Sequence, residues 1–194
     1  MSRNEAFNTL FANGMSYEDY VQRSDRHQER MQLSSTATDH YLSETDPELK
    51  EAANHPMKVV CIAENWCGDC ANGVPVIAKM AEVMDNWTFK IAPRDDYEDL
   101  VEQYYTTAGR KKIPVIIFAD EDGDEVTRWV ERPTQSYQIL ADLQARKLPK
   151  EEYISEYKSN PSLKPPKVSH IITDELLNAA VKTASMLKIM PKKR

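Results

Sequence analysis

The sequence contains few of the residues on which several protein classes depend. Three cysteines in 194 residues are too few for the disulfide framework of a small secreted protein. No apolar run approaches the roughly 18 residues of a membrane-spanning helix, and residues 1–5 do not begin an apolar signal segment. With 41% hydrophobic and 29% charged residues, the chain resembles neither a disordered nor a fibrous protein. We therefore expect a soluble cytoplasmic protein with no membrane partner.

The sequence contains few glycines, and its acidic residues outnumber its basic ones. The five glycines form no Gly-x-Gly pair, so no nucleotide-binding loop is predicted. A formal net charge of −6 argues against a nucleic-acid partner, because binding phosphates requires surplus Lys and Arg. The charge is uneven, since residues 147–194 carry ten basic and five acidic side chains and leave −11 to residues 1–146. We expect the basic end to fold back onto the acidic body; an anionic partner is the alternative.

The hydrophobic pattern of residues 56–146 predicts an α/β fold. Short runs rich in β-branched residues alternate with segments of helical periodicity, in the order β-α-β-α-β-β-α. The first two strands should run parallel as part of a βαβ unit, and the Asp122-Gly123 turn should join the last two as a hairpin. The predicted strands are residues 58–63, 87–92, 114–119 and 125–130, and the predicted helices begin at Gly68, Asp95 and Thr134. Together they form a mixed β-sheet with helices on both faces.

Both ends of the chain are predicted to be extensions of this domain. Residues 1–55 form a helical N-terminal extension, in which Ser16 caps a loosely amphipathic helix reaching Leu33 and Pro47 begins a second, short helix. Residues 147–194 begin as an irregular connector because of their prolines. A basic helix over residues 173–190 follows, and we expect it to pack on the core. The connector prolines are Pro149, Pro161, Pro165 and Pro166.

The stretch most informative about chemistry is Trp66-Cys67-Gly68-Asp69-Cys70. Cys67 lies where a buried strand gives way to a helix. At that position free backbone N–H groups and the helix dipole stabilise a thiolate over a thiol. Cys70 follows one helical turn later, where its thiol can displace whatever Cys67 has bound. The spacing therefore indicates a redox-active cysteine pair.

These residues and their surroundings resemble the thioredoxin family. In that family a tryptophan precedes the first cysteine, a proline kinks the active-site helix, a cis-proline opens the next strand, and a turn joins the last two strands. The matching positions here are Trp66, Pro75 (eight residues after Cys67), the Ile113-Pro114 pair and Asp122-Gly123. The resemblance covers residues 56–146 and, with the Cys-Gly-Asp-Cys sequence and N-terminal extension, points to a bacterial subgroup. It implies a thioredoxin-like fold.

The resemblance also implies an activity and a site. Cys67 would attack a protein or low-molecular-weight disulfide, and Cys70 would resolve the mixed disulfide. The Cys67–Cys70 disulfide would be the only redox group, with no other cofactor and no metal, and electrons would come from an external reductase or thiol donor. Trp66 would form a flat apolar rim, and Pro114 would expose the neighbouring backbone to an extended substrate. The substrate-binding residues implied are Trp66, Gly68, Asp69, Ile113 and Pro114.

Three positions depart from the family pattern. Cys61 stands where thioredoxins have a buried aspartate that assists proton transfer, and we expect it to be a small core residue. Glu64 is a candidate replacement as proton acceptor, or else a solvated loop carboxylate. Asp69 replaces a proline and should raise the pKa of Cys67, which favours a reductant near thioredoxin at about −270 mV. Arg132 replaces a small residue and should narrow the range of accepted disulfides.

Two other functions fit the same residues. The chain could be a redox-inactive thioredoxin-fold module that binds partners as an adaptor. Alternatively, Cys61, Cys67 and Cys70 with one histidine could hold zinc, which needs four ligands. The zinc interpretation is weak, because Cys61 lies within a core strand and no histidine has ligand spacing. The four histidines are His27, His40, His55 and His170.

Overall fold

A four-stranded mixed sheet forms the centre of the computed structural model, which describes residues 1–190. The strands are β1 (Met57–Ala63), β2 (Trp87–Pro93), β3 (Val115–Ala119) and β4 (Glu125–Val130). Their order across the sheet is β2-β1-β3-β4. β1 and β2 pair in parallel, whereas β3 pairs antiparallel with both β1 and β4. The predicted parallel pair, the hairpin and the order of elements are confirmed.

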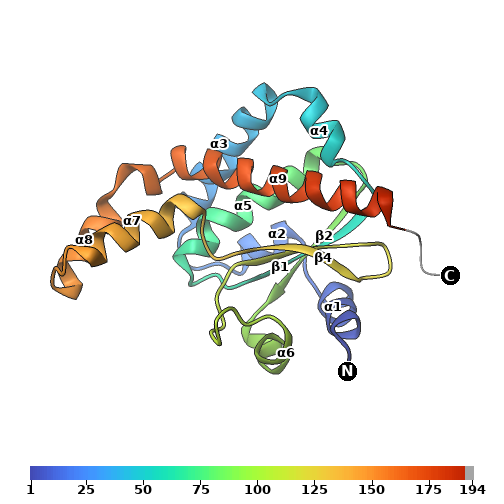
Figure 1. Cartoon of the computed structure of the whole chain (residues 1–194), viewed down its shortest axis with the longest axis horizontal. Helices are drawn as coiled ribbons and strands as arrows, with labels where there is room; N and C mark the ends of the chain where they lie inside the picture. The colour runs from blue at the N-terminus through green and yellow to red at the C-terminus, as the bar shows by residue number, and fades with distance from the viewer. Residues whose placement is uncertain (191–194) are drawn as a thin grey trace.

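Helices cover both faces of this sheet (Figure 1). On one face α5 (Gly68–Val83) packs against α3 (Gln28–Glu44) and α9 (Lys167–Ile189). On the other face lie α1 (Arg3–Ala12) and α6 (Glu98–Tyr104). The remaining helices are α2 (Tyr17–Gln22), α4 (Pro47–Ala53), α7 (Thr134–Ala145) and α8 (Lys150–Ser159). This layered α/β architecture is the one that the sequence predicts.

Apart from Lys58, the two strands at the centre of the sheet are apolar, because layers of helices bury both of their faces. Every residue of β3 is buried, as are all residues of β1 except Lys58. Cys61 lies fully buried in β1, paired with Ile91 on one side and Ile116 on the other. It is therefore a core residue, as expected.

The N-terminal segment packs closely against the sheet. Ala6, Phe7 and Leu10 of α1 are fully buried. The backbone of Met15 exchanges two hydrogen bonds with Ile91 at the open edge of β2, with N···O distances of 2.8 and 3.0 Å. This bridge fixes where α2 begins. The predicted cap is confirmed, since the Ser16 side chain accepts a hydrogen bond from the backbone of Asp19.

Several predicted elements differ from the structure. The single helix predicted from Ser16 to Leu33 is two helices, α2 and α3, separated at His27, whose φ of 60° is left-handed. The helix predicted from Asp95 is a 3-10 turn at 95–97 followed by α6. Residues 147–166 are not simply irregular, because α8 occupies residues 150–159. Its prolines flank the helix instead of interrupting it, and it has no buried residue that a hydrophobic pattern could reveal.

The C-terminal helix docks on the core, as predicted, but it begins earlier, at Lys167. Its buried face includes Ile172, Leu176 and Ala180, and it contacts α4, α5 and β4. Lys192, Lys193 and Arg194, which contribute to the predicted basic end, lie outside the described residues. Between residues 1 and 190, no helix combines the length and apolar composition needed to cross a membrane.

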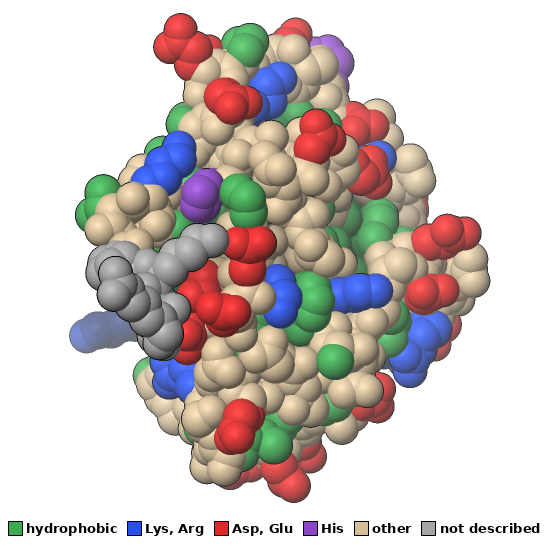
Figure 2. Space-filling view, turned by 90° about the vertical axis from the view of Figure 1, so that its right-hand side faces the viewer, with side chains coloured by type: hydrophobic (Ala, Val, Ile, Leu, Met, Phe, Trp, Pro, Cys, Tyr) green, Lys and Arg blue, Asp and Glu red, His purple; other side chains and the backbone are tan. Residues whose placement is uncertain are grey.

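Figure 2 views the end of the molecule where α9 finishes. Acidic side chains gather on part of this end. The β3–β4 turn and the last turn of α9 line a hollow there. The cysteine pair is at the N-terminal end of α5, so this acidic end is not part of the site described below.

Candidate functional site

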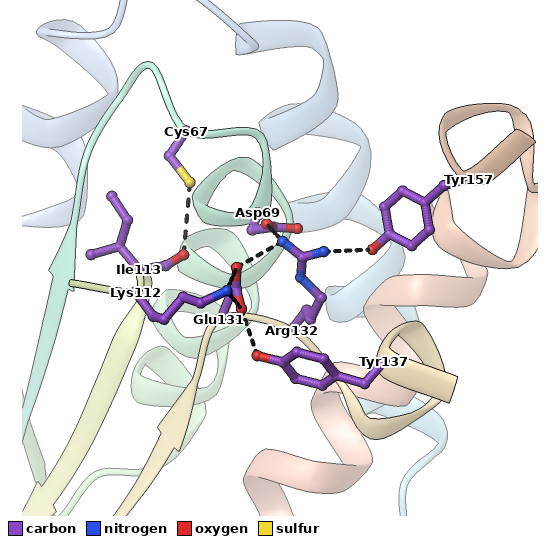
Figure 3. A network of polar contacts seen from close by, with 8 residues as sticks. All are labelled: Cys67, Asp69, Lys112, Ile113, Glu131, Arg132, Tyr137 and Tyr157. Atoms are coloured by element: carbon purple, nitrogen blue, oxygen red, sulfur yellow. Dashed lines mark hydrogen bonds and ion pairs between the residues drawn. The ribbon is translucent and has the colours of Figure 1, made fainter. Parts of the chain in front are cut away.

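Cys67 occupies the N-cap of α5, directly after the loop that follows β1. Its own N–H donates to the carbonyl oxygen of Glu64 at 3.2 Å. The side chain is half-buried, and its thiol points to the carbonyl oxygen of Ile113 at 3.7 Å (Figure 3). Cys70, one turn along the helix, is fully buried. Both are free thiols in this structure.

The two thiols differ in acidity. A hydrogen bond from the Cys70 thiol is the main cause that lowers the pKa of Cys67, helped by the backbone N–H groups of Cys70 and Asp69. Burial raises the pKa of Cys70 well above the usual range of a thiol. Near neutral pH, Cys67 is therefore the thiol that ionises more readily, while Cys70 stays protonated. The pair thus combines one readily ionised thiol with one buried, protonated thiol.

The Ile113-Pro114 peptide bond is cis, as the family resemblance implies. Gly73 of α5 allows the helix to approach closely, since a Cβ there would lie 3.1 Å from Pro114 Cγ and 3.5 Å from the Trp129 ring. The Pro114 carbonyl accepts a hydrogen bond from the Glu131 backbone at 2.7 Å. These contacts place the 113–114 segment against the Cys67 thiol.

Trp66 lies on the surface beside Cys67 with 42% of its area exposed. The Arg94 guanidinium lies 4.9 Å from the indole ring centre, and the indole N–H donates to Asp95 at 3.3 Å. His27 contacts the Trp66 carbonyl oxygen at 3.3 Å. The exposed indole is consistent with the predicted rim, although Arg94 covers part of the ring.

On the other side of Cys67 lies a charged network (Figure 3). Arg132 pairs with Asp69 at 2.6 Å and with Glu131 at 2.8 Å, and it also donates to the Tyr157 hydroxyl at 3.3 Å. Lys112 pairs with the buried Glu131 at 2.7 Å. The network thus joins α5, the segment before β3, the segment after β4, and α8.

Asp69 affects Cys67 less than the sequence suggests. Its carboxylate does oppose the Cys67 thiolate, as predicted. Burial raises the pKa of Asp69, and the neighbouring Arg132 guanidinium pulls it back down. Arg132 compensates part of the carboxylate charge, and the Cys70 thiol is the main cause that keeps the pKa of Cys67 lowered overall. The sequence gives no sign of the pairing, since the two residues are 63 positions apart.

Glu64 lies at the end of β1, beside a buried hydroxyl that the sequence analysis missed. Burial raises the pKa of Glu64, and its carboxylate accepts a hydrogen bond from the Asp95 N–H at 2.7 Å. Tyr20 of α2 is 3% exposed, and its hydroxyl has no partner among the described residues. Burial raises its pKa, with Cys70 and Glu64 among the groups that raise it further. A hollow of about 30 Å³ is lined by both Tyr20 and Glu64, which leaves room for a water molecule.

The structure brings most of the predicted site residues to one region. Cys67, Gly68, Asp69 and Cys70 share the first turn of α5, with Trp66 and Glu64 preceding it and Ile113, Pro114 and Arg132 across from it. The candidate zinc ligands do not converge. Within residues 1–190, no three His, Cys, Asp or Glu side chains are arranged to hold a metal ion.

A sequence model described as Thioredoxin matches residues 14–146. The chain belongs to the thioredoxin family. The match begins 42 residues before the resemblance seen in the sequence, which covers 56–146, and so takes in α2, α3 and α4. No curated protein matches this member of the family.

Two solved structures share the fold. A crystal structure of a protein of unknown function from Pseudomonas aeruginosa is 18% identical, has a TM-score of 0.59, and covers 97% of this chain and 98% of its own. An HIV epitope-scaffold is 16% identical with a TM-score of 0.59, covering 89% of this chain and 96% of its own. At these identities the likeness concerns the fold alone.

The Asp69–Arg132 pair makes a testable prediction about acidity. Arg132→Ala should raise the pKa of Cys67, because the Asp69 carboxylate would then oppose the thiolate without compensation. Adding Asp69→Asn to that variant should bring the pKa back to the wild-type value or below. Thiolate absorbance near 240 nm against pH measures both. Equal pKa values in all three proteins would contradict electrostatic compensation.

Proposed function

We propose that this thioredoxin-family protein is a thiol–disulfide oxidoreductase that reduces disulfides of proteins or small molecules. The observation that supports this most strongly is the asymmetry of the cysteine pair. Cys67 is half-buried with a lowered pKa, and Cys70 is fully buried with a raised one. An adaptor has no need of an accessible, readily ionised thiol beside a protected one.

The proposed reaction has two steps. The Cys67 thiolate attacks one sulfur of the substrate, the substrate S–S bond breaks, and the other sulfur leaves as a thiolate that takes up a proton. Cys70 then loses its proton and attacks Cys67 Sγ, which releases the second substrate thiol. Two electrons pass to the substrate and a Cys67–Cys70 disulfide remains. An external reductase or thiol donor must return two electrons and two protons.

The second step needs an acceptor for the Cys70 proton, and we assign Glu64. Burial raises the pKa of Glu64 toward neutral pH. A general base is most effective when its pKa lies near the pH of the reaction. Tyr20 and one water in the adjoining hollow would connect Cys70 with Glu64. The Tyr20 hydroxyl is suited to this because it is buried and has no hydrogen-bond partner within residues 1–190. The proton would leave through this hollow instead of through the family's aspartate position, which Cys61 occupies.

The substrate would lie across Trp66, Gly68, Asp69 and the Ile113-Pro114 segment. Arg132 would narrow the range of substrates, because its side chain is 17% exposed and held by the network beside Cys67. We place the reaction in the cytoplasm, with no cofactor beyond the cysteine pair and no nucleic-acid or membrane partner.

The activity is tested with matched serine variants. Wild-type protein should reduce insulin disulfides with dithiothreitol as the electron donor. Cys70→Ser should accumulate mixed disulfides through Cys67 in a cell extract, because the resolving thiol is absent. Cys67→Ser is the control and should trap none. A wild-type protein that reduces neither insulin nor small disulfides would overturn the proposal, and partner binding by Cys67→Ser would then favour an adaptor.

The direction of electron flow is a separate prediction. Equilibration with reduced and oxidised dithiothreitol, followed by alkylation of the remaining thiols, gives the reduction potential of the pair. We expect a value nearer thioredoxin, at about −270 mV, than a strong oxidant at about −120 mV. A result above about −150 mV would contradict a reducing role.

The role of Glu64 is tested on the resolving step alone. Glu64→Gln should slow release of substrate from a preformed Cys67 mixed disulfide at pH 7 by about tenfold or more, since a positioned base is lost. The difference should shrink as pH rises, because hydroxide increasingly takes the Cys70 proton. Glu48→Gln, an exposed carboxylate on α4, is the control. Equal rates for Glu64→Gln and wild type at pH 7 would exclude this role.

A further inference from the structure

A small hollow lies beside the first turns of α5, on the side that faces the C-terminal helices, and is lined by Asp69 and Asn72, which flank Cys70 in the sequence. Its volume is about 70 Å³. The polar residues that line it come from α3, α5, the segment after β4, α7 and α8: Arg30, Asp69, Asn72, Glu131, Arg132, Ser136, Tyr157 and Lys158. The reaction proposed above uses Asp69 and Arg132 of this lining but assigns no role to Arg30, Asn72 or the hollow itself.

Arg30 is the first indication of a ligand. Its side chain is half-buried, yet it makes no hydrogen bond or ion pair with any of residues 1–190. Its guanidinium lies beside Gly68, since a Cβ on that glycine would be 3.6 Å from Arg30 Nη1. Gly68 directly follows the nucleophile. A cation that has lost part of its hydration without gaining a counter-charge favours an anion at this place.

Two further polar atoms of the hollow also have no partner. Asn72 is only 8% exposed, and its side-chain Oδ1 accepts no hydrogen bond from the part of the chain that the structure describes. Nε of Arg132 is buried and donates to nothing among residues 1–190. Buried polar groups are normally hydrogen-bonded, and a hollow of this size admits water or a small polar group. The site therefore offers both donors and an acceptor to a ligand.

The side chains around the hollow carry more positive than negative charge. Arg132 neutralises Asp69, and Lys112 neutralises Glu131. Arg30 and the exposed Lys158 remain as excess positive charge. This local surplus is opposite in sign to the net charge of −6 of the whole chain. It would attract an anionic group to the side of the nucleophile.

We propose that this hollow receives a carboxylate of the substrate, held by the Arg30 guanidinium, so that the enzyme favours small disulfides of the cystine type. In such molecules the carboxylate and an N–H group are both attached to the carbon next to the CH₂–S unit. A planar carboxylate matches the guanidinium fork, and the N–H group matches Asn72 Oδ1. The inference rests on the proposed disulfide reduction, and it specifies the class of substrate.

Cystine and cystamine form a suitable pair of probes, because cystamine lacks only the two carboxylates of cystine. The second-order rate constants of the reduced protein with each probe give a cystine-to-cystamine ratio. Arg30→Gln should lower this ratio about threefold or more, the effect of one unit charge at roughly 6 Å in water. Arg30→Lys should retain most of the wild-type cystine-to-cystamine ratio, because it keeps the positive charge. A ratio that is the same in wild type and Arg30→Gln would overturn the inference.

Lys182→Gln is the matched control. It removes one positive charge from an exposed position of α9, about 15 Å along the helix from Ile172, which lines the hollow. At 0.15 M salt this charge is screened from Cys67, so the ratio should not change. A drop equal to that of Arg30→Gln would show that only net charge matters, which contradicts a local site.

A second experiment tests the anion site independently of the proposed disulfide reduction. Iodoacetate and iodoacetamide alkylate Cys67 by forming an S–C bond and releasing iodide, and they differ in the carboxylate. Their rate ratio does not depend on disulfide chemistry or on the thiolate fraction. It should fall about threefold in Arg30→Gln. If neither cystine nor cystamine reacts but the iodoacetate-to-iodoacetamide ratio falls in Arg30→Gln, the proposed redox function is wrong and the anion site is supported. If that ratio is the same in Arg30→Gln and wild type, the anion site is wrong.

Discussion

The chemistry of this protein depends on one constraint, which is that two thiols one helical turn apart lie in different surroundings. Cys67 is at the very start of α5, where backbone N–H groups have no carbonyl partners within the helix. Cys70 is inside the core, where ionisation is costly. The Cys70 thiol makes this difference useful, because it stabilises the thiolate form of the half-buried Cys67 and so lowers the pKa of that residue. The Ile113-Pro114 segment and the charged network are arranged around this turn.

Much of the scaffold follows from local sequence. β1 and β3 are nearly continuous apolar runs. Such a run by itself indicates a strand that is buried on both faces, independently of the segments that follow it. The turn that carries Cys67 and Cys70 was predictable for the same reason, since it follows one of these runs after three residues and begins an amphipathic helix. The position of Cys61 in the core also follows from its place within a run. These features depend on neighbours along the chain.

What the sequence does not show are contacts between distant segments. Asp69 appears as a lone carboxylate beside a thiolate, and only the fold brings Arg132 to it. Tyr20 appears as one apolar residue of a helix, although its hydroxyl comes close to the thiols. α8 gave no signal because it buries no residue, and hydrophobic periodicity reports burial. The electrostatic surroundings of the cysteines are thus set by partners that no local pattern identifies.

The residues around the cysteine pair come from well outside the central sheet. Tyr20 and Arg30 precede β1, and Tyr157 follows α7. A fragment trimmed to residues 56–146 would keep both cysteines but lose these three side chains, and it would expose the apolar surface that α1 and α9 now cover. Sequence change in the terminal helices can therefore alter reactivity without touching the Cys-Gly-Asp-Cys turn. The N- and C-terminal helices therefore help to set the electrostatic surroundings of the cysteine pair.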